Sequence, residues 1–221
     1  MPREHKNLVR LSNVKSPAKL LFIASEGANT ERQYFNELER ACDKNIVHPF
    51  HLQRHDDDIG RSAPSHVLKE IACFKSKSPI KFKKGDEFWV VLDVDNWTNL
   101  PEIVQGCEKA NVHLAISCPC FDLWMLLHVT DVEKLDTETK EKIRTNAKIS
   151  NSHSFLSQYL SEAMTAKLGK SFTKKKSNSQ SLMPHIETAI KRAKALTGNL
   201  TIPSSLGSNV YKLVEKIKIE D

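Results

Sequence analysis

Two stretches decide the fold of this chain: Leu20–Gly27, which reads LLFIASEG, and Phe88–Asp95, which reads FWVVLDVD. Each begins as an apolar run typical of a strand buried on both faces, and acidic residues follow that run. When strands run parallel in one sheet, their carboxyl ends lie at the same edge, so Glu26 can approach Asp93 and Asp95 there. Side chains two residues apart point to the same face of a strand, as Asp93 and Asp95 would. The sequence therefore predicts three carboxylates gathered at one edge of a parallel sheet.

The rest of the first half alternates strands and helices, which is typical of an α/β fold. We expect further strands at residues 46–54 and 112–117, and helices at residues 31–42, 63–75, 100–110 and 120–128. Thr30 and Gln33 have the spacing of a capping box for the first of these helices. Right-handed crossovers would then give a mostly parallel central sheet flanked by helices.

After residue 130 the sequence changes to charged and helical segments, the last of which we expect Ser208 to cap. We therefore divide the chain into an α/β core, residues 1–130, and a helical basic extension packed on the same domain, residues 131–221. The charge is also divided. Residues 1–140 carry 19 Lys and Arg against 21 Asp and Glu, whereas residues 141–221 carry 14 against 6. This asymmetry is expected if one part holds a metal and another holds phosphates, although solvated helix faces would also explain it.

The composition argues against several classes of protein. No apolar run is long enough to span a bilayer, and residues 1–10 lack a signal-peptide pattern, so we expect a cytoplasmic protein. The five cysteines are odd in number and unevenly spread, which also favours a reducing compartment. Cys118 and Cys120 are too closely spaced for a zinc knuckle. Neither a Walker A sequence nor a G-x-G-x-x-G sequence is present, so we do not expect this chain to hydrolyse ATP itself.

The three carboxylates point to a hard divalent cation. Acidic groups that meet at one sheet edge repel one another unless a cation compensates their charge. Ligation by oxygen alone selects Mg²⁺ or Mn²⁺ over zinc, and such an ion can activate water and neutralise charge on a phosphoryl group. The alternative for Asp93 and Asp95 is a simple exit from a strand into a turn, where Asp is common.

Three blocks of the sequence resemble the RloB/AbiLii family, a Toprim-like family of prokaryotic antiphage and abortive-infection loci. The blocks are EGANTERQYF at Glu26–Phe35, DVD at Asp93–Asp95 and SCPCFDLWMLLH at Ser117–His128. A weaker likeness covers Ser204–Lys216. The family pattern has Asn where this chain has Cys118, and Glu where this chain has Asp122.

This resemblance implies a Toprim-like fold and Mg²⁺-dependent cleavage of phosphodiester bonds in RNA, tRNA among the candidates, or in DNA. It implies that Glu26 is a metal ligand or a general acid/base, and that Asp93 and Asp95 bind the metal. The resemblance also makes Asp122 a candidate metal ligand, but because Asp122 is shorter than the family's Glu, it would reach the metal only through water if the longer Glu binds it directly. Family members often occur beside an ATPase, so the resemblance also implies an ATPase partner that restrains or triggers cleavage.

Some site candidates have a second interpretation. Glu31 could support the site, but an acidic residue in a first helical turn is also favourable against the helix dipole. Thr30 could support the site or cap the helix. Asp122 could likewise be a helix cap, or an acidic residue that interacts favourably with the helix dipole. His128 could support the site or be a satisfied core histidine, because it lies on an apolar helix stripe.

The basic half of the chain supplies candidates for nucleic-acid binding. Clustered lysines beside a phosphodiesterase site can hold a nucleic-acid backbone without reading its sequence. The alternative is a mobile, solvated loop. Our candidates are Lys170, Lys174, Lys175, Lys176, Lys191 and Arg192.

Three functions agree with these patterns to different degrees. The first is a metal-dependent nuclease that acts as an effector in antiphage defence. The second is a catalytically inert nucleic-acid-binding or regulatory subunit of an ATPase-containing complex. The third is a receiver-like phosphoacceptor at Asp93, which is weaker because no suitably placed Lys follows Ser117. The sequence leaves the oligomeric state open, with a homo-oligomer among the options.

Overall fold

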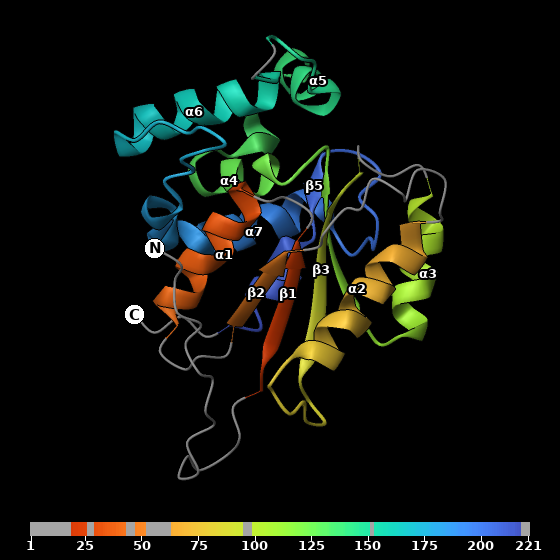
Figure 1. Cartoon of the computed structure of the whole chain (residues 1–221). Coiled ribbons are helices and arrows are strands. Elements are labelled where there is room, and N and C mark those ends of the chain that lie inside the picture. Colours follow the sequence, from red (N-terminus) through yellow and green to blue (C-terminus); the bar gives the residue numbers. More distant parts are fainter. Residues whose placement is uncertain are drawn as a thin grey trace.

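The computed structural model describes residues 19–25, 29–42, 47–51, 63–94, 99–150 and 153–217, without the side chains of residues 51 and 63–67. Its centre is a five-stranded sheet with the order β2-β1-β3-β4-β5 (Figure 1). The strands are β1 (Leu21–Ser25), β2 (Val47–His51), β3 (Glu87–Asp93), β4 (His113–Cys118) and β5 (Gly207–Ser208). The first four are parallel, and β5 is antiparallel to β4. The expected α/β fold with a mostly parallel sheet is therefore confirmed.

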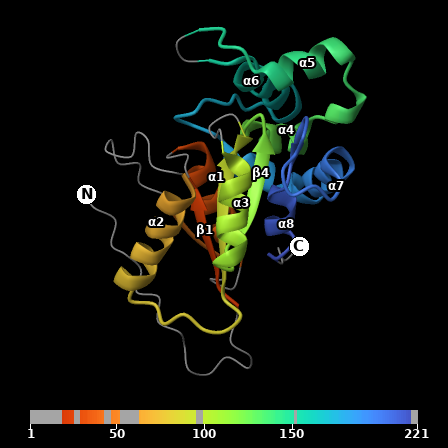
Figure 2. The same ribbon diagram turned by 90° about the vertical axis from the view of Figure 1, so that its right-hand side faces the viewer.

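Helices cover both faces of the sheet (Figure 2). The helices are α1 (Thr30–Ala41), α2 (Ala63–Lys77), α3 (Leu100–Lys109), α4 (Asp122–Val129), α5 (Thr137–Thr145), α6 (Phe155–Leu168), α7 (Ile186–Thr197) and α8 (Val210–Val214), with 3-10 turns η3 (Val132–Lys134) and η4 (Ser179–His185). Alternate residues of the strands face opposite sides. Leu21 and Ile23 pack with α1, α4 and α7, whereas Phe22 and Ala24 pack with α2 and α3.

The order in which strands are added to the sheet reverses at β1. From β1 the chain passes to β2 on one side, and it then returns to β3 on the other side of β1. In open α/β sheets, ligands bind beyond the carboxyl ends of the strands at such a switch point. The register pairs Ser25 with Val91, so β3 continues two residues further to Asp93. The helices α5 and α6 lie beyond this carboxyl-end edge, at the top of Figure 1.

The structure corrects two expected helix caps. The residue that caps α1 is Asn29, and Thr30 is the first residue of the helix. The predicted capping box of Thr30 and Gln33 is wrong, because the side chain of Gln33 hydrogen-bonds instead to residues 174, 175 and 177. The capping position of the last helix is Asn209 and not Ser208, although Ser208 Oγ accepts a hydrogen bond from the N–H of Val210, the first residue of α8, at 3.4 Å. Ser208 lies in β5, a strand that the sequence did not predict, and its Oγ hydrogen-bonds to Ser117 Oγ at 2.8 Å.

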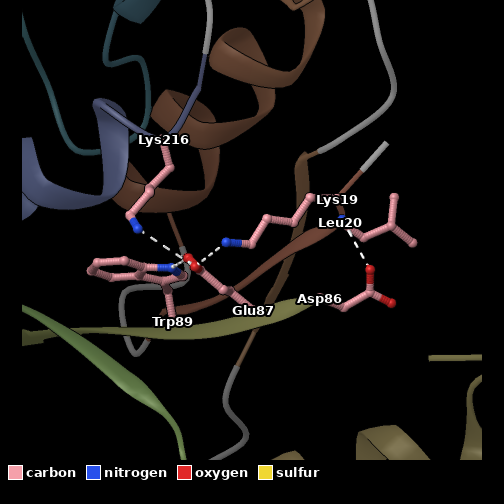
Figure 3. Close-up of polar contacts among 6 residues, drawn as sticks. All are labelled: Lys19, Leu20, Asp86, Glu87, Trp89 and Lys216. Atoms are coloured by element: carbon pink, nitrogen blue, oxygen red, sulfur yellow. Dashed lines mark hydrogen bonds and ion pairs between the residues drawn. The ribbon is translucent and has the colours of Figure 1, made fainter. Parts of the chain in front are cut away.

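The amino-terminal end of β3 is fixed by charge pairing (Figure 3). The carboxylate of Glu87 pairs with Lys19 before β1 and with Lys216 after α8, and it accepts a hydrogen bond from Trp89 Nε1 at 2.9 Å. Burial opposes ionisation of Glu87, but these bonds and the lysine charges outweigh it and lower its pKa from the ordinary value. The same cluster therefore joins both ends of the described chain to the sheet.

Residues from both sides of position 130 share one hydrophobic cluster. Leu21 and Tyr34 pack in the same cluster as Leu160, Ala189 and Leu213. The division at residue 130 stays a prediction. Within the described parts of the chain, none of the helices has the length and apolar character needed to cross a membrane.

Candidate active site

Asp93 is the last residue of β3, at the carboxyl-end edge of the sheet. It pairs in register with Ser117 of β4 and is half-buried. Its Oδ1 atom accepts a hydrogen bond from the backbone N–H of Phe121 at 2.8 Å. The carboxylate is therefore held against the start of α4, which follows β4 in the chain.

Asp122 is the first residue of α4 and is buried. The segment that leads to it leaves β4 at Cys118 and contains a cis peptide bond between Cys118 and Pro119. Because Asp93 is hydrogen-bonded to the residue directly before Asp122, the two acidic residues lie at the same corner of the sheet. Asp122 is not the cap of α4, because Phe121 occupies the capping position, but it is the acidic residue in the first turn, where it is favourable against the helix dipole.

Two of the three predicted carboxylates, Glu26 and Asp95, lie outside the described residues. Their convergence with Asp93 stays a prediction. In the described segments, no group of three or more His, Cys, Asp or Glu side chains is placed to hold a metal ion. Glu31 is half-buried in the first turn of α1, and Thr30 is buried at the start of that helix.

His128 lies inside the protein and links α4 to α1. Its Nε2 is 3.1 Å from the hydroxyl of Tyr34, and its Nδ1 is 2.9 Å from the carbonyl oxygen of Trp124. The ring of Tyr34 also contacts those of Phe121, Trp124 and His128, with centroids 5.5, 6.2 and 5.6 Å away. All four side chains are buried. This aromatic cluster fixes the start of α4, and therefore Asp122, relative to α1.

Burial sets the protonation states in this cluster. It lowers the pKa of His128 to about 3, with nearby His185 and Arg192 acting in the same direction, and it raises the pKa of Tyr34. Both groups are therefore neutral at neutral pH. His128 is thus a buried, neutral residue that links α4 to α1, and its predicted supporting role at the site stays a prediction.

The six basic candidates fall into different environments. Lys170, Lys174, Lys175 and Lys176 are exposed between α6 and η4, and Lys191 is exposed on α7. Arg192 is half-buried and donates a hydrogen bond to the carbonyl oxygen of Leu127 at 2.7 Å. Its guanidinium therefore supplies a hydrogen-bond donor to a backbone carbonyl in the last turn of α4. The sequence did not reveal this structural contact.

Comparison with models of protein families matches residues 21–217 to the family described as RloB-like protein. The chain belongs to the RloB-like family. The matched region begins at the first residue of β1 and ends at Ile217, a buried residue after α8, so it includes the whole sheet. No curated protein and no solved structure matches the chain.

In this RloB-like chain, the three motif blocks meet at the start of α4, where Asp93 of the second block accepts a hydrogen bond from the N–H of Phe121 of the third. Tyr34 and Phe35 of the first block pack against Phe121 and Trp124 of the third. The sequence interpretation concentrated on acidic residues and overlooked this aromatic contact. A signal was present in the sequence, because Tyr34 lies one helical turn after Thr30, and Trp124 and His128 are also one helical turn apart.

Proposed function

We propose that this RloB-like protein is a metal-dependent nuclease that hydrolyses phosphodiester bonds of RNA or DNA. The observation that supports it most is the corner formed by Asp93, Phe121 and Asp122. This corner lies at the carboxyl ends of β3 and β4, beside the switch point of the sheet, where α/β proteins bind their ligands. In the sequence, Glu26 directly follows the last residue of β1, and Asp95 comes two residues after the last residue of β3.

The donor chemistry of this edge fits a hard divalent cation, because carboxylate oxygens are the ligands that Mg²⁺ and Mn²⁺ prefer. We propose that Glu26, Asp93 and Asp95 hold the ion, and that Asp122 adds a ligand directly or through water. When bound, such an ion neutralises charge on the phosphodiester and lowers the pKa of water. The backbone N–H of Phe121 keeps the Asp93 carboxylate oriented throughout.

The acidic strand ends also bear on the type of fold. A strand exit with Glu26, followed by a central strand exit with Asp93 and Asp95, is the arrangement that the Toprim resemblance implies. We therefore propose a Toprim-like variant of the α/β fold and a role as effector in antiphage defence. The family resemblance implies an ATPase partner, and we propose that another chain supplies it, since this chain has no Walker A sequence.

The direct test is a cleavage assay. Purified protein is incubated with tRNA, single-stranded DNA and duplex DNA in Mg²⁺, in Mn²⁺ or in EDTA. We expect cleavage of at least one substrate with either metal and none in EDTA, and we expect Glu26→Ala and Asp93→Ala to abolish it. Glu108→Gln, on the exposed surface of α3, is the matched control and should cleave normally.

Cleavage that survives in Asp93→Ala or Glu26→Ala would remove these residues from the mechanism. Nucleic-acid binding without cleavage under every condition would support the inert, regulatory alternative. In that case the two carboxylate variants should retain normal binding and leave any toxicity in cells unchanged.

A further inference from the structure

The Lys-rich segment after α6 is a fixed hairpin. Thr173 and Lys176 exchange two backbone hydrogen bonds of 3.0 Å, which close a tight turn with Lys174 and Lys175 at its tip. Residues 173–176 are exposed, but they stand between two buried residues, Phe172 and Ser177. Phe172 lies in the hydrophobic cluster of α1, α4 and α7, and its N–H bonds to Ser161 Oγ of α6 at 3.1 Å. The lysines therefore project from a rigid base.

The amide of Gln33 fastens this hairpin to α1. Its oxygen accepts hydrogen bonds from the backbone N–H of Ser177 at 3.0 Å and from the hydroxyl of Ser177 at 3.1 Å. Its nitrogen donates to the carbonyl oxygens of Lys174 and Lys175 at 3.4 and 3.3 Å. One side chain in the first turns of α1 thus holds both sides of a loop more than 140 residues away.

The hairpin lysines differ from other cations of the basic half. Lys194 pairs with Glu215, Lys216 pairs with Glu87, and Arg192 bonds to a backbone carbonyl. Within the described residues, Lys174, Lys175 and Lys176 form no ion pair with an acidic side chain, and neither does Lys170 nearby. Four exposed positive charges within seven residues fit a polyanion better than a protein partner.

We infer that Gln33 is a positioning residue, which locks the hairpin Thr173–Lys176 to α1 as a clamp for the phosphate backbone of a nucleic acid. This inference rests on the proposed nuclease function. The helix that Gln33 belongs to starts beside the carboxyl-end edge of the sheet, just after β1. The clamp therefore sets the distance between a bound phosphate and the acidic corner. No aromatic side chain lies in residues 173–176, so the clamp reads charge and not bases.

The first experiment measures whether Gln33 holds the hairpin. Gln33→Met keeps the length of the side chain and removes all four hydrogen bonds. The matched control is Gln158→Met, because Gln158 is exposed on α6 and its amide bonds only to Glu162 of the same helix. Under limited trypsin digestion of the full chain, we expect cleavage after residues 174–176 to be about fivefold faster in Gln33→Met than in the control.

The second experiment measures binding of a fluorescent 30-nucleotide RNA and of a DNA duplex in EDTA, so that no cleavage is needed. The triple variant Lys174→Ala/Lys175→Ala/Lys176→Ala should reduce the slope of log K against log salt by about 2 to 3, since each phosphate contact contributes about 0.7 to 0.9. Gln33→Met keeps its lysines, so its slope should stay near that of the wild type. Its affinity should fall about three- to tenfold, because a loosened clamp must be ordered on binding.

Equal trypsin sensitivity and equal affinity in Gln33→Met and Gln158→Met would overturn the inference, as would a triple lysine variant with an unchanged salt slope. An unfolded Gln33→Met variant is recognised by circular dichroism. In that case Ser177→Ala, which removes one of the four bonds, should show the same two effects at smaller size, and their absence would overturn the inference. Because Ser177 Oγ also contacts Ser179 Oγ at 2.6 Å, Ser179→Ala is the matched control and should show neither effect. Gln33-dependent binding without metal-dependent cleavage would uphold the clamp and reject the nuclease.

Discussion

The two ends of β3 use acidic side chains in opposite ways. At the amino-terminal end, Glu87 meets two lysines and an indole N–H, so its charge is compensated by the protein itself (Figure 3). At the carboxyl-terminal end, Asp93 is held by a backbone N–H directly before a second acidic residue, Asp122. The first arrangement stabilises the fold, whereas the second places two acidic residues at the edge where α/β sheets bind ligands.

The largest effect should come from the carboxyl-terminal end. Asp93→Asn keeps an oxygen that can accept the N–H of Phe121 but removes the negative charge. Because loss of even an outer partner of a metal ligand costs about 10- to 100-fold, we expect cleavage to fall by more than about 100-fold. The fold should persist, as measured by urea unfolding. If Asp93→Asn cleaved within threefold of the wild-type rate, the charge of Asp93 would not be needed for cleavage, and the proposed difference between the two ends of β3 would be wrong.

A second prediction concerns the cluster that positions α4. His128→Leu leaves the buried hydroxyl of Tyr34 without its nitrogen partner, which should lower the free energy of unfolding by about 1 to 3 kcal/mol. The double variant Tyr34→Phe/His128→Leu removes both polar groups and should lose less than the sum of the single variants. A strictly additive double variant would show that the Tyr34–His128 contact contributes nothing.

The same histidine should give a pH signature. Folded His128 stays neutral down to about pH 3, whereas the unfolded side chain takes up a proton near its ordinary pKa of 6.5. Its contribution to stability is therefore present above pH 6.5 and is lost as the pH falls toward 3, at about 1.4 kcal/mol per pH unit. Urea unfolding at pH 7 and pH 5 should show a smaller pH dependence in His128→Leu than in the exposed control His153→Ala. Equal slopes would contradict a buried neutral imidazole.

The smallest effect should come from the amino-terminal end. Glu87→Gln removes the charge that pairs with Lys19 and Lys216, both of them exposed, and should cost about 0.2 to 1 kcal/mol of stability without changing cleavage. The lowered pKa of Glu87 makes its contribution present above about pH 4.5 and lost as the pH falls through the folded-state pKa. Wild type and Glu87→Gln should therefore converge in stability at acid pH. A loss of cleavage in this variant would remove the distinction between the two ends.

The sequence predicted those parts of the fold that depend on local pattern. The continuous apolar runs of β1 and β3 identified the two central strands, and their parallel pairing followed from the helices between them. It could not predict β5, because Gly207 and Ser208 have no hydrophobic alternation and pair only through contact with β4. The capping box failed for a similar reason. Gln33 had the right spacing for a local bond, but a partner 144 residues away, Ser177, takes its oxygen.

The candidate site shows the same limit. The sequence predicted Asp93 at the carboxyl end of an apolar strand, and the structure has it there as the last residue of β3. The gathering of Glu26 and Asp95 beside it stays a prediction. The sequence could not show that the N–H of Phe121 would hold Asp93, since that bond requires the fold to bring β3 and α4 together. Nor could the sequence distinguish the structural role of Arg192, which donates a hydrogen bond to the last turn of α4, from that of the exposed lysines of the hairpin.

The central claim is that Glu26 and Asp93 share one divalent cation, and anomalous diffraction from a crystal soaked in Mn²⁺ tests it most directly. We expect an anomalous peak about 2.0 to 2.3 Å from carboxylate oxygens of both residues. A peak elsewhere, or Glu26 on the opposite side of the sheet from Asp93, would contradict it.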